Sequence, residues 1–515
     1  MSPSPTIPLF HAERPLKRRR ANSFDQAPSA PRVLSPAPAP APGPLSALTT
    51  PPLSKPNKPY YRPIPPPLHP LSAPPTRPIA FQQPLHLTSF SYSPTRQLLL
   101  TPQDRDASLA VYTPPRIGTD LNTGFEQAVW RDDSGDEGLD ALLQHYVESD
   151  PTGAAGEMLD KVNIITWRGM ITKLLLAVYE VEAAHNDAAN SRRTRAEGWE
   201  MNLMLLGVGS GMRHQESDWT CNSTNLGQHC RVHQNTLYLE ESKTPARLEA
   251  KAASEKSYLR QSYYGYSFEA FSTRSPQSTS SYTNPTFEPP NTNVQWCSIV
   301  KTNLGGFRMF LGGEVDCLRA GWTEADSIRT DDFVELKTNI VISSQRDEMM
   351  FERQKLLKHY TQSFLLGVPT IIVGFRTRTG HLSALQSFKT LEIPRLHVAV
   401  RNKPHAWSPT TSLTSAFDLI QFIISTLSSD ENNQAAEEEF KVNGKIPEQE
   451  WPVWRMRFRP LEEGRGGGGV LELVQLTGGV VEEEVLGGKR KEERVGFLLK
   501  RWVEGLGRRG AGTGA

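Results

Sequence analysis

The chain has 515 residues and a formal net charge of +1, and this length could hold two or three average domains. No apolar run is long enough to cross a bilayer, and the proline-rich start does not resemble a secretory signal. The four cysteines form no CxxC pair, which favours a reducing compartment without structural disulfides. We therefore expect no membrane partner.

The first 80 residues differ in composition from the rest of the chain. They hold 23 of the 41 prolines, and proline fixes φ and lacks the amide proton that helices and sheets need. We predict a disordered, proline-rich arm over residues 1–85. Within it, RPLKRRR at residues 14–20 has the composition of a nuclear import signal, although a chance basic patch would look the same. The import reading predicts a nuclear protein.

The following residues alternate helical and β-type segments. We predict a mostly buried helix over residues 163–181 and strands over residues 198–208 and 235–242. The polar stretch between these strands, residues 208–232, is predicted as a low-complexity surface insertion. A helix-like stretch at residues 246–258 then leads to YYGYSFEAF.

The centre and the C-terminal part complete a mixed pattern. A second low-complexity insertion is predicted over residues 272–293. Three strands follow, at residues 294–302, 306–317 and 332–343. A helix over residues 344–367, further strands and an amphipathic helix come next, before a glycine-rich break at 464–469. We predict an α+β domain of mixed β-sheets flanked by helices over residues 86–463, with a separate C-terminal segment over 464–515.

Two of the central strands carry charged residues at alternate positions. Glu314 and Asp316 lie in LGGEVDC, and Glu335 and Lys337 lie in VELKT. Residues i and i+2 of a strand share a face, so each pair should project together. If the two strands are neighbours, three carboxylates and one ammonium group converge.

Crowded carboxylates indicate a metal site. Desolvated carboxylates repel one another, and an isolated buried charge is costly. Mg²⁺ or Mn²⁺ takes hard oxygen ligands and removes this repulsion. One or, as we expect, two such ions would activate water for phosphoryl hydrolysis. The lysine would orient the water, help to deprotonate it, or stabilise charge on the phosphate. The alternative is a surface salt bridge between strand-edge acids and the lysine.

An acid on one strand followed by ExK on the next resembles the PD-(D/E)xK nuclease core. It occurs together, in order, with TWRGMITKLL, YYGYSFEAF, LGGEVDC, VELKT and QSFLLGVPTIIVGFR. This set, over roughly residues 88–430, resembles the DXO-type decapping nuclease family. The fungal members of that family are known as Rat-one-interacting proteins. The arm, the 208–232 insertion and the 464–469 break lie outside the resemblance.

The resemblance implies roles for individual residues. The metal ions would be served by Glu269, Glu314, Asp316, Glu335 and the backbone carbonyl of Leu336. Catalysis would involve Glu314, Asp316, Glu335, Lys337 and Gln362. The substrate side would include Trp167, Arg168, Gly169, Glu314, Lys337, Gln362, Cys297 and Glu137. Arg168 has the planar charged fork that suits phosphate oxygens, and a helix-surface arginine is its alternative. Cys297 could instead be a packed strand cysteine, and Glu137 a solvated helix acid.

The family also implies an activity and partners. A member would be a metal-dependent RNA 5′-end hydrolase that removes pyrophosphate from 5′-triphosphate RNA, and removes incompletely methylated or NAD caps. It would act with a nuclear 5′→3′ exoribonuclease in RNA quality control. The alternative is a mainly non-catalytic stabilising partner of that exoribonuclease. Tyr263, Tyr264 and Tyr266 could stack on a base or simply pack in the core.

Overall fold

The computed structural model describes most of the chain from Lys58 onward, which forms one compact unit. The described residues are 58–66, 78–132, 138–149, 162–189, 198–207, 235–243, 245–276, 287–396, 406–443, 446, 450–460 and 469–511. The basic block at 14–20, the insertion at 208–232 and Glu137 lie outside them. Among the described helices, none is both long enough and apolar enough to span a membrane.

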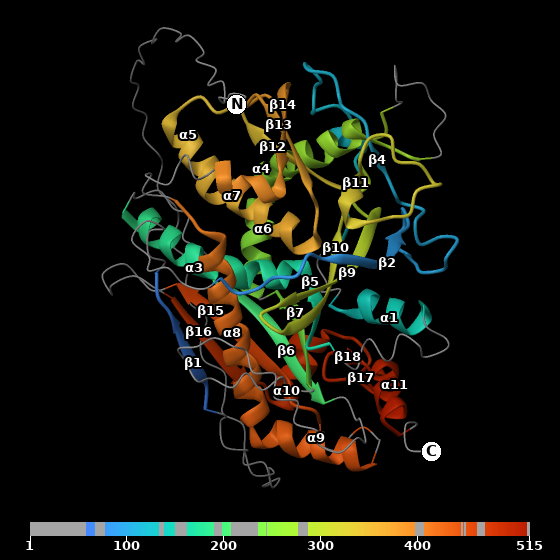
Figure 1. The fold of residues 1–515 in the computed structure, drawn as a ribbon, viewed down its shortest axis with the longest axis vertical. Helices are drawn as coiled ribbons and strands as arrows, with labels where there is room; N and C mark the ends of the chain where they lie inside the picture. The colour runs from blue at the N-terminus through green and yellow to red at the C-terminus, as the bar shows by residue number, and fades with distance from the viewer. Residues whose placement is uncertain are drawn as a thin grey trace, which may run out of the picture. The chain divides into compact units, whose positions relative to one another are not determined.

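A ten-stranded mixed sheet forms the larger layer (Figure 1). Its strands, in spatial order, are β1 (Tyr60–Ile64), β16 (Gly469–Gln475), β15 (Trp454–Pro460), β6 (Trp199–Gly207), β7 (Asn235–Ser242), β5 (Ile164–Trp167), β10 (Phe307–Glu314), β9 (Gln295–Leu304), β2 (Leu85–Tyr92) and β3 (Leu98–Leu99). Strand β5 runs parallel to both β7 and β10. It therefore lies in the interior of the sheet, where both of its faces are covered.

A six-stranded mixed sheet forms the second layer. Its strands, in spatial order, are β14 (Leu382–Lys389), β13 (Thr370–Arg376), β12 (Phe333–Ile340), β11 (Cys317–Leu318), β4 (Val111–Tyr112) and β8 (Thr273–Arg274). A small hairpin joins β17 (Arg494–Val495) to β18 (Leu498–Leu499). The chain passes from the larger sheet to the smaller one directly after β10.

Helices cover both sheets. They are α1 (Asp140–Ser149), α3 (Arg168–Ala189), α4 (Pro245–Ser272), α5 (Gln345–Met350), α6 (Leu357–Leu366), α7 (Ile393–Leu396), α8 (Pro409–Ser429), α9 (Glu431–Asn443), α10 (Gly478–Val480) and α11 (Lys500–Ala511). Two π-helical turns span Phe351–Leu356 and Val481–Leu486, and 3-10 turns span Phe125–Gln127, Thr330–Asp332, Thr390–Glu392 and Lys491–Glu493. Helix α6 contacts β10 and β13, so it packs against both sheets.

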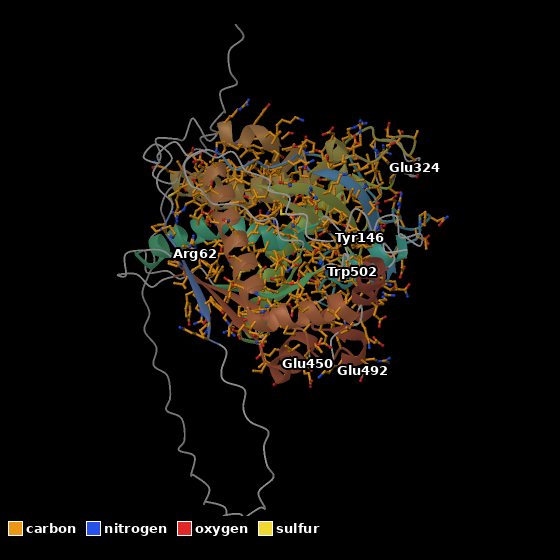
Figure 2. The ribbon with its side chains drawn as sticks, turned by 60° about the horizontal axis from the view of Figure 1, so that its bottom comes forward. Arg62, Tyr146, Glu324, Glu450, Glu492 and Trp502 are labelled. Carbon is orange, nitrogen blue, oxygen red and sulfur yellow. The ribbon has the colours of Figure 1, made fainter. Side chains whose placement is uncertain are left out.

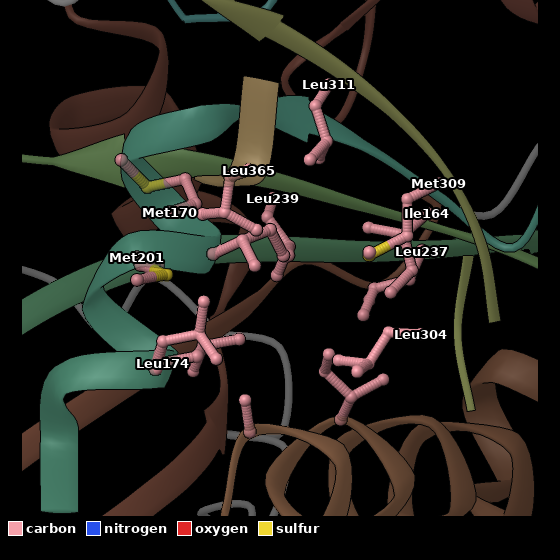
Figure 3. Close-up of a cluster of buried hydrophobic side chains, with 14 of the residues drawn as sticks. Ile164, Met170, Leu174, Met201, Leu237, Leu239, Leu304, Met309, Leu311 and Leu365 are labelled. Carbon is pink, nitrogen blue, oxygen red and sulfur yellow. The ribbon is translucent and has the colours of Figure 1, made fainter. Parts of the chain in front are cut away.

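The larger sheet buries apolar side chains on both faces. Ile164 and Met309 belong to a cluster with α3 and α8 (Figure 3), whereas their strand neighbours Ile165 and Phe310 belong to a second cluster. This second cluster takes side chains from α1, α9 and α11. The alternation follows from the strand period of two.

The smaller sheet lies between α4 and α6. Phe268 of α4 packs against Leu336 of β12 on one face. Tyr360 of α6 packs with Val373 of β13 on the other. Mixed sheets flanked by helices confirm the predicted α+β class.

The predicted disordered arm extends too far. Residues 60–64 form β1, which pairs antiparallel with β16, and Ile64 is only 3% exposed. Strand β1 lies at the edge of the sheet and contains Pro63, whose missing amide proton costs little where no neighbouring strand needs a donor. The prediction of a proline-rich arm up to residue 85 was therefore wrong at its C-terminal end.

The predicted boundary at residue 463 is also wrong. Strand β16 lies inside the larger sheet, paired with both β1 and β15. Trp502 of α11 packs near Tyr146 of α1, with ring centroids 6.1 Å apart (Figure 2). Arg494 donates to both carboxylate oxygens of Asp140, at 2.5 and 2.6 Å. The C-terminal segment is thus part of the main core.

Two other predicted segments need correction. The predicted helix over 163–181 divides into strand β5 and helix α3, so Trp167 ends a strand and Arg168 begins a helix. The predicted loop over 272–293 begins with β8, which pairs with β4. Near its other end, Asn291 forms an isolated parallel bridge with Val129.

Candidate active site

Glu314 and Asp316 lie where the chain crosses between the sheets. Glu314 is the last residue of β10, and Asp316 immediately precedes β11. Strands β10 and β12 are in different sheets, so the acids converge although these two strands are not hydrogen-bonded neighbours. The short strand β11 pairs with β12 instead and brings Asp316 beside it, where the Leu336 amide donates to Asp316 Oδ2 at 2.6 Å.

Two glycines before the acids allow a close approach. A Cβ atom on Gly312 would lie 3.0 Å from the Trp167 ring, and one on Gly313 would lie 2.5 Å from Leu366 Cδ1. The glycines in LGGEVDC therefore let Trp167, at the end of β5, and Leu366, at the end of α6, pack directly on β10. This close packing brings Arg168 to the acids.

Glu335 is the centre of an ion-pair network. Its side chain is 1% exposed and accepts from Arg168 at 3.1 Å and from Lys337 at 2.7 Å. The Lys337 ammonium also lies 3.5 Å from Asp316 Oδ2 and donates to the Leu336 carbonyl at 3.0 Å. The structure thus brings together the two predicted cations and the predicted acids of both motifs.

The two cations determine the ionisation of Glu335. Burial alone would raise the pKa of this carboxyl, but the charges of Arg168 and Lys337 outweigh burial and hold the pKa at about 2. Burial likewise disfavours the Lys337 ammonium, yet Asp316 and Glu335 raise its pKa above the ordinary value. Both partners are therefore charged at neutral pH.

The other acids are held in a different state. Burial, followed by the charge of Asp316, raises the pKa of Glu314 to about 7. Burial also raises the pKa of Asp316, and burial together with Asp316 raises that of Glu269 well above its ordinary value. A raised pKa favours the protonated, neutral form of these three carboxyl groups, and a bound cation would favour their charged form instead.

The donor set fits a divalent cation. Four carboxylates (Glu269, Glu314, Asp316 and Glu335) face two cations, which leaves an excess of two negative charges when all are ionised. Carboxylate and carbonyl oxygens are the ligands that Mg²⁺ and Mn²⁺ prefer. Across the described ranges, however, no three acidic, histidine or cysteine side chains are already arranged to hold a metal ion. Lys337 pairs with Asp316 and Glu335, and Arg168 pairs with Glu335.

The predicted substrate residues divide into three groups. Arg168 and Gln362 lie together, since the backbone carbonyl of Gln362 accepts a hydrogen bond from the Arg168 guanidinium at 3.4 Å. Trp167 donates from its indole to the Gly138 carbonyl at 2.8 Å, while a Cβ on Gly169 would meet nothing within 4 Å. Cys297 lies opposite Glu314 in the sheet, but its side chain is buried in the apolar cluster under the sheet. The packing alternative for Cys297 is thus favoured over substrate contact.

Sequence reasoning missed Gln295. Its side-chain amide donates to Glu314 Oε2 at 2.9 Å. Its carbonyl oxygen accepts from Arg96 at 2.6 Å and from Arg131 at 3.4 Å. The signal was available: Gln295 lies two residues before Cys297, which pairs with Glu314, but its use required knowing that β9 and β10 are neighbours.

Comparisons with known proteins decide the family. Residues 82–210 and 222–486 match the family described as RAI1 like PD-(D/E)XK nuclease. The chain belongs to this family. It is therefore a nuclease, and hence a hydrolase. The match also includes residues 208–210 and 222–232 of the predicted insertion and the glycine-rich break at 464–469, all of which were predicted to lie outside the resemblance.

Curated relatives agree with this assignment. A decapping nuclease RAI1 of Cryptococcus neoformans is 32% identical over 439 residues, which cover 83% of this chain and 95% of the relative. A second, from Mycosarcoma maydis, is 30% identical and covers 84% of this chain and 88% of the relative. The decapping and exoribonuclease protein of Mus musculus is 31% identical, with 68% of this chain and 77% of the relative covered.

Solved structures share the fold. The crystal structure of S. pombe Rai1 in complex with 3′-FADP matches with a TM-score of 0.53 and 23% identity, over 82% of this chain and 100% of that chain. Candida albicans Rai1 in complex with pU5-Mn²⁺ matches with a TM-score of 0.58 and 21% identity, over 83% and 95%. The mixed sheets and flanking helices are therefore those of a known nuclease fold.

Proposed function

We propose that this chain is a divalent-metal-dependent hydrolase of RNA 5′ ends. The observation that carries the proposal is the convergence of Glu314, Asp316, Glu335 and Lys337 where the two sheets meet, with Arg168 beside them. The names of the relatives, decapping nucleases from several fungi, support RNA 5′ ends as the substrate. A relative crystallised with a 5′-phosphorylated oligouridylate and Mn²⁺ supports both the substrate class and the metal.

We assign the metal to the buried carboxylates that converge at the site. Glu314, Asp316 and Glu335 would hold it, with Glu269 directly or through water and the Leu336 carbonyl completing the oxygen ligands. When bound, a divalent ion supplies a Lewis acid that generates a nucleophilic water and stabilises charge on the phosphate. We propose that two such ions bind, either Mg²⁺ or Mn²⁺.

Before a metal binds, Lys337 is protonated, because Asp316 and Glu335 raise its pKa. We propose that it donates to a phosphate oxygen, orients the attacking water or helps to deprotonate that water. Arg168 uses one edge of its guanidinium for Glu335 and Gln362. Its remaining N–H groups would bind phosphate oxygens. Gln362 would orient the water.

The preferred reaction is removal of a 5′ leaving group, not degradation of the chain. Hydrolysis would release pyrophosphate from 5′-triphosphate RNA, or remove incompletely methylated or NAD caps, and leave a 5′-monophosphate. Such an end suits a 5′→3′ exoribonuclease, which we propose as the functional partner in RNA quality control. A mainly non-catalytic role as a stabilising partner of that exoribonuclease is the second candidate.

The activity is tested with four RNAs that differ only at the 5′ end: triphosphate, GpppN cap, NAD cap and monophosphate. Each is incubated with the full chain and Mn²⁺ or Mg²⁺, or with EDTA. We expect products from the first three RNAs only with metal. No product from any of them would favour the stabilising role over the enzymatic one.

Site variants test the assignment of the acids. Glu314→Gln and Asp316→Asn should each reduce hydrolysis by at least about 100-fold, since outer-shell partners alone give losses of about 10–100-fold. Asp326→Asn is the matched control, because Asp326 is an exposed acid that pairs at the surface with Arg319. Full activity of both site variants would refute the assignment.

A nuclear location is the remaining proposal. Deleting residues 14–20 should move a fluorescent fusion from the nucleus toward the cytoplasm. Deleting the adjacent residues 21–27, which contain no lysine or arginine, serves as the control. An unchanged nuclear signal after the first deletion would contradict the import motif.

A further inference from the structure

Aromatic side chains gather at the surface beside the start of the 3-10 turn at Phe125. Trp130 is 36% exposed and Tyr266 is 38% exposed, whereas the adjacent Tyr263 is fully buried. The Trp130 ring lies edge-on to Tyr266 at 6.0 Å and to Phe125 at 6.4 Å between centroids. We call Phe125, Trp130 and Tyr266 the aromatic shelf.

The shelf is held rigidly. Phe125 packs edge-on against Tyr263 at 5.0 Å, and the hydroxyl of Tyr263 donates to the Thr123 carbonyl. The backbone around Trp130 is fixed on both sides, since the Val129 amide donates to the Pro290 carbonyl at 3.0 Å, and the Arg131 amide donates to a threonine hydroxyl at 2.7 Å. A ligand would therefore find the rings already in place, with little conformational entropy to lose.

The shelf is connected to the acids in two ways, through a chain of hydrogen bonds and through helix α4. Arg131 follows Trp130 and donates to Gln295, and Gln295 in turn donates to Glu314. Tyr266 lies three residues before Glu269 on α4, and residues at this spacing are neighbours on a helix surface. Trp130 and Tyr266 therefore each lie close in the structure to a carboxylate that we propose binds metal, Glu314 and Glu269 respectively.

The charge around the shelf suits a polyanion. The Arg260 guanidinium lies 4.5 Å from the centroid of the Phe125 ring, and Arg131 adjoins Trp130. Arg96 contacts the same glutamine as Arg131. Exposed aromatic rings with arginines between them are the surface on which single-stranded nucleic acids stack their bases. Two exposed rings beside cations favour a nucleotide chain over an apolar protein segment.

We propose that the aromatic shelf binds nucleobases of the RNA whose 5′ end lies at the acids. This inference rests on the proposed function and adds to it a base-stacking site outside the catalytic residues. Stacking does not distinguish strongly among bases, because every base has a π-face. The shelf would therefore select single-stranded RNA of sufficient length, not a particular sequence.

The test measures binding rather than hydrolysis. A fluorescent 5′-monophosphate pentanucleotide with phosphorothioate linkages is titrated with the full chain in Mn²⁺, and Kd is obtained from anisotropy. Trp130→Ala should raise Kd about tenfold, within the range that loss of one stacked base gives, and Trp130→Phe should raise it no more than about threefold. Tyr61→Ala is the matched control, because Tyr61 is 58% exposed on the distant edge strand β1.

A change on the RNA side makes the test independent of protein folding. One abasic nucleotide is placed at each position in turn, and the effect of Trp130→Ala is measured again. At the position that contacts the shelf, the abasic RNA should bind wild-type and variant protein equally. At the other positions, the tenfold difference should remain.

The outcomes separate this inference from the proposed function. Unchanged Kd for both Trp130→Ala and Tyr266→Ala would overturn the shelf as an RNA site and leave it as a protein contact, without affecting hydrolysis. No measurable binding of the pentanucleotide would overturn it as well. Trp130-dependent binding without hydrolysis of any 5′ end would uphold the shelf and contradict the enzymatic proposal.

Discussion

At the residue scale, the site contains two kinds of carboxylate. Glu335 is buried and paired with Arg168 and Lys337, so its carboxylate is ionised even without a bound ligand. Glu314 has a pKa near 7 because burial and Asp316 both oppose its charge. Glu335 thus fixes the geometry of Arg168 and Lys337, while Glu314 and Asp316 hold the charge that a cation would relieve.

The Arg168–Glu335 pair should contribute to stability. Arg168→Met would leave the buried Glu335 carboxylate with Lys337 alone, and loss of one partner of a buried pair costs about 3 kcal/mol. Urea unfolding should show a loss of this size. Arg490→Met is the control, because Arg490 and Glu493 form an exposed pair that contributes about 0–1 kcal/mol. Equal stabilities of the two variants would contradict this role for Arg168.

A buried histidine predicts how stability depends on pH. The His145 ring is fully buried, contacts Thr88 at 2.9 Å and has a pKa lowered by burial to about 4. The unfolded chain takes up a proton near pH 6.5, whereas the folded chain does so only near pH 4. As the pH decreases from about 6.5 to about 4, the free energy of unfolding should therefore fall by about 1.4 kcal/mol per pH unit because of this group. Above pH 6.5 this group should have no effect on it.

The histidine effect is measured by urea unfolding at several pH values. His145→Gln keeps a hydrogen-bonding group for Thr88 but cannot titrate, so the slope below pH 6.5 should be shallower. His381→Gln is the control, because His381 is exposed. An equal slope in His145→Gln and in the wild-type chain would contradict the effect.

At the element scale, some segments were predictable and others were not. Strands β9, β10 and β12 were predicted from their β-forming residues, and the helix ending in QSFLLG from its length, although a π-helical turn divides it. The sequence pattern predicts a helix where β5 lies, because an interior parallel strand is apolar on both faces and has no alternation to reveal it. That error hid the strand-to-helix junction that presents Arg168.

Strand β1 should stabilise the edge of the larger sheet. Ile64→Ala removes a buried side chain and should cost about 2–5 kcal/mol in the free energy of unfolding. Tyr61→Phe, which removes only an exposed hydroxyl bonded to Glu472, should cost less than about 0.5 kcal/mol. Chemical denaturation of both variants checks the difference. A neutral Ile64→Ala variant would show that β1 adds nothing to the core.

At the scale of the whole molecule, the sequence predicted the fold class and the residues that converge, but not how they meet. The i, i+2 spacing of Glu314 and Asp316 suggested one strand, whereas the chain leaves one sheet and enters the other between them. Strand spacing describes local geometry only, so it cannot reveal a change of sheet. Gln295 and the contribution of the C-terminal segment could not be predicted either, because the sequence does not reveal which strands pair.

The C-terminal segment should be needed for folding. Ending the chain at residue 463 would remove β16 from the larger sheet and Trp502 and Leu506 from the cluster beneath it. We expect this variant to lose its cooperative thermal transition and to be cleaved rapidly by protease. A truncated chain with a wild-type melting temperature would restore the boundary first predicted at 463.

The crossing after β10 has a mechanical consequence. Any cation bound by both Glu314 and Glu335 would cross-link the two sheets. These sheets are otherwise joined by side-chain packing, the Arg168–Glu335 ion pair and a short stretch of backbone. Ligand occupancy should then slow amide hydrogen exchange in β10 and β12 together, although they belong to separate hydrogen-bond networks. Cation binding and the resistance of the two sheets to local separation would then depend on the same carboxylates. Substitutions of Glu314 or Glu335 should therefore weaken both.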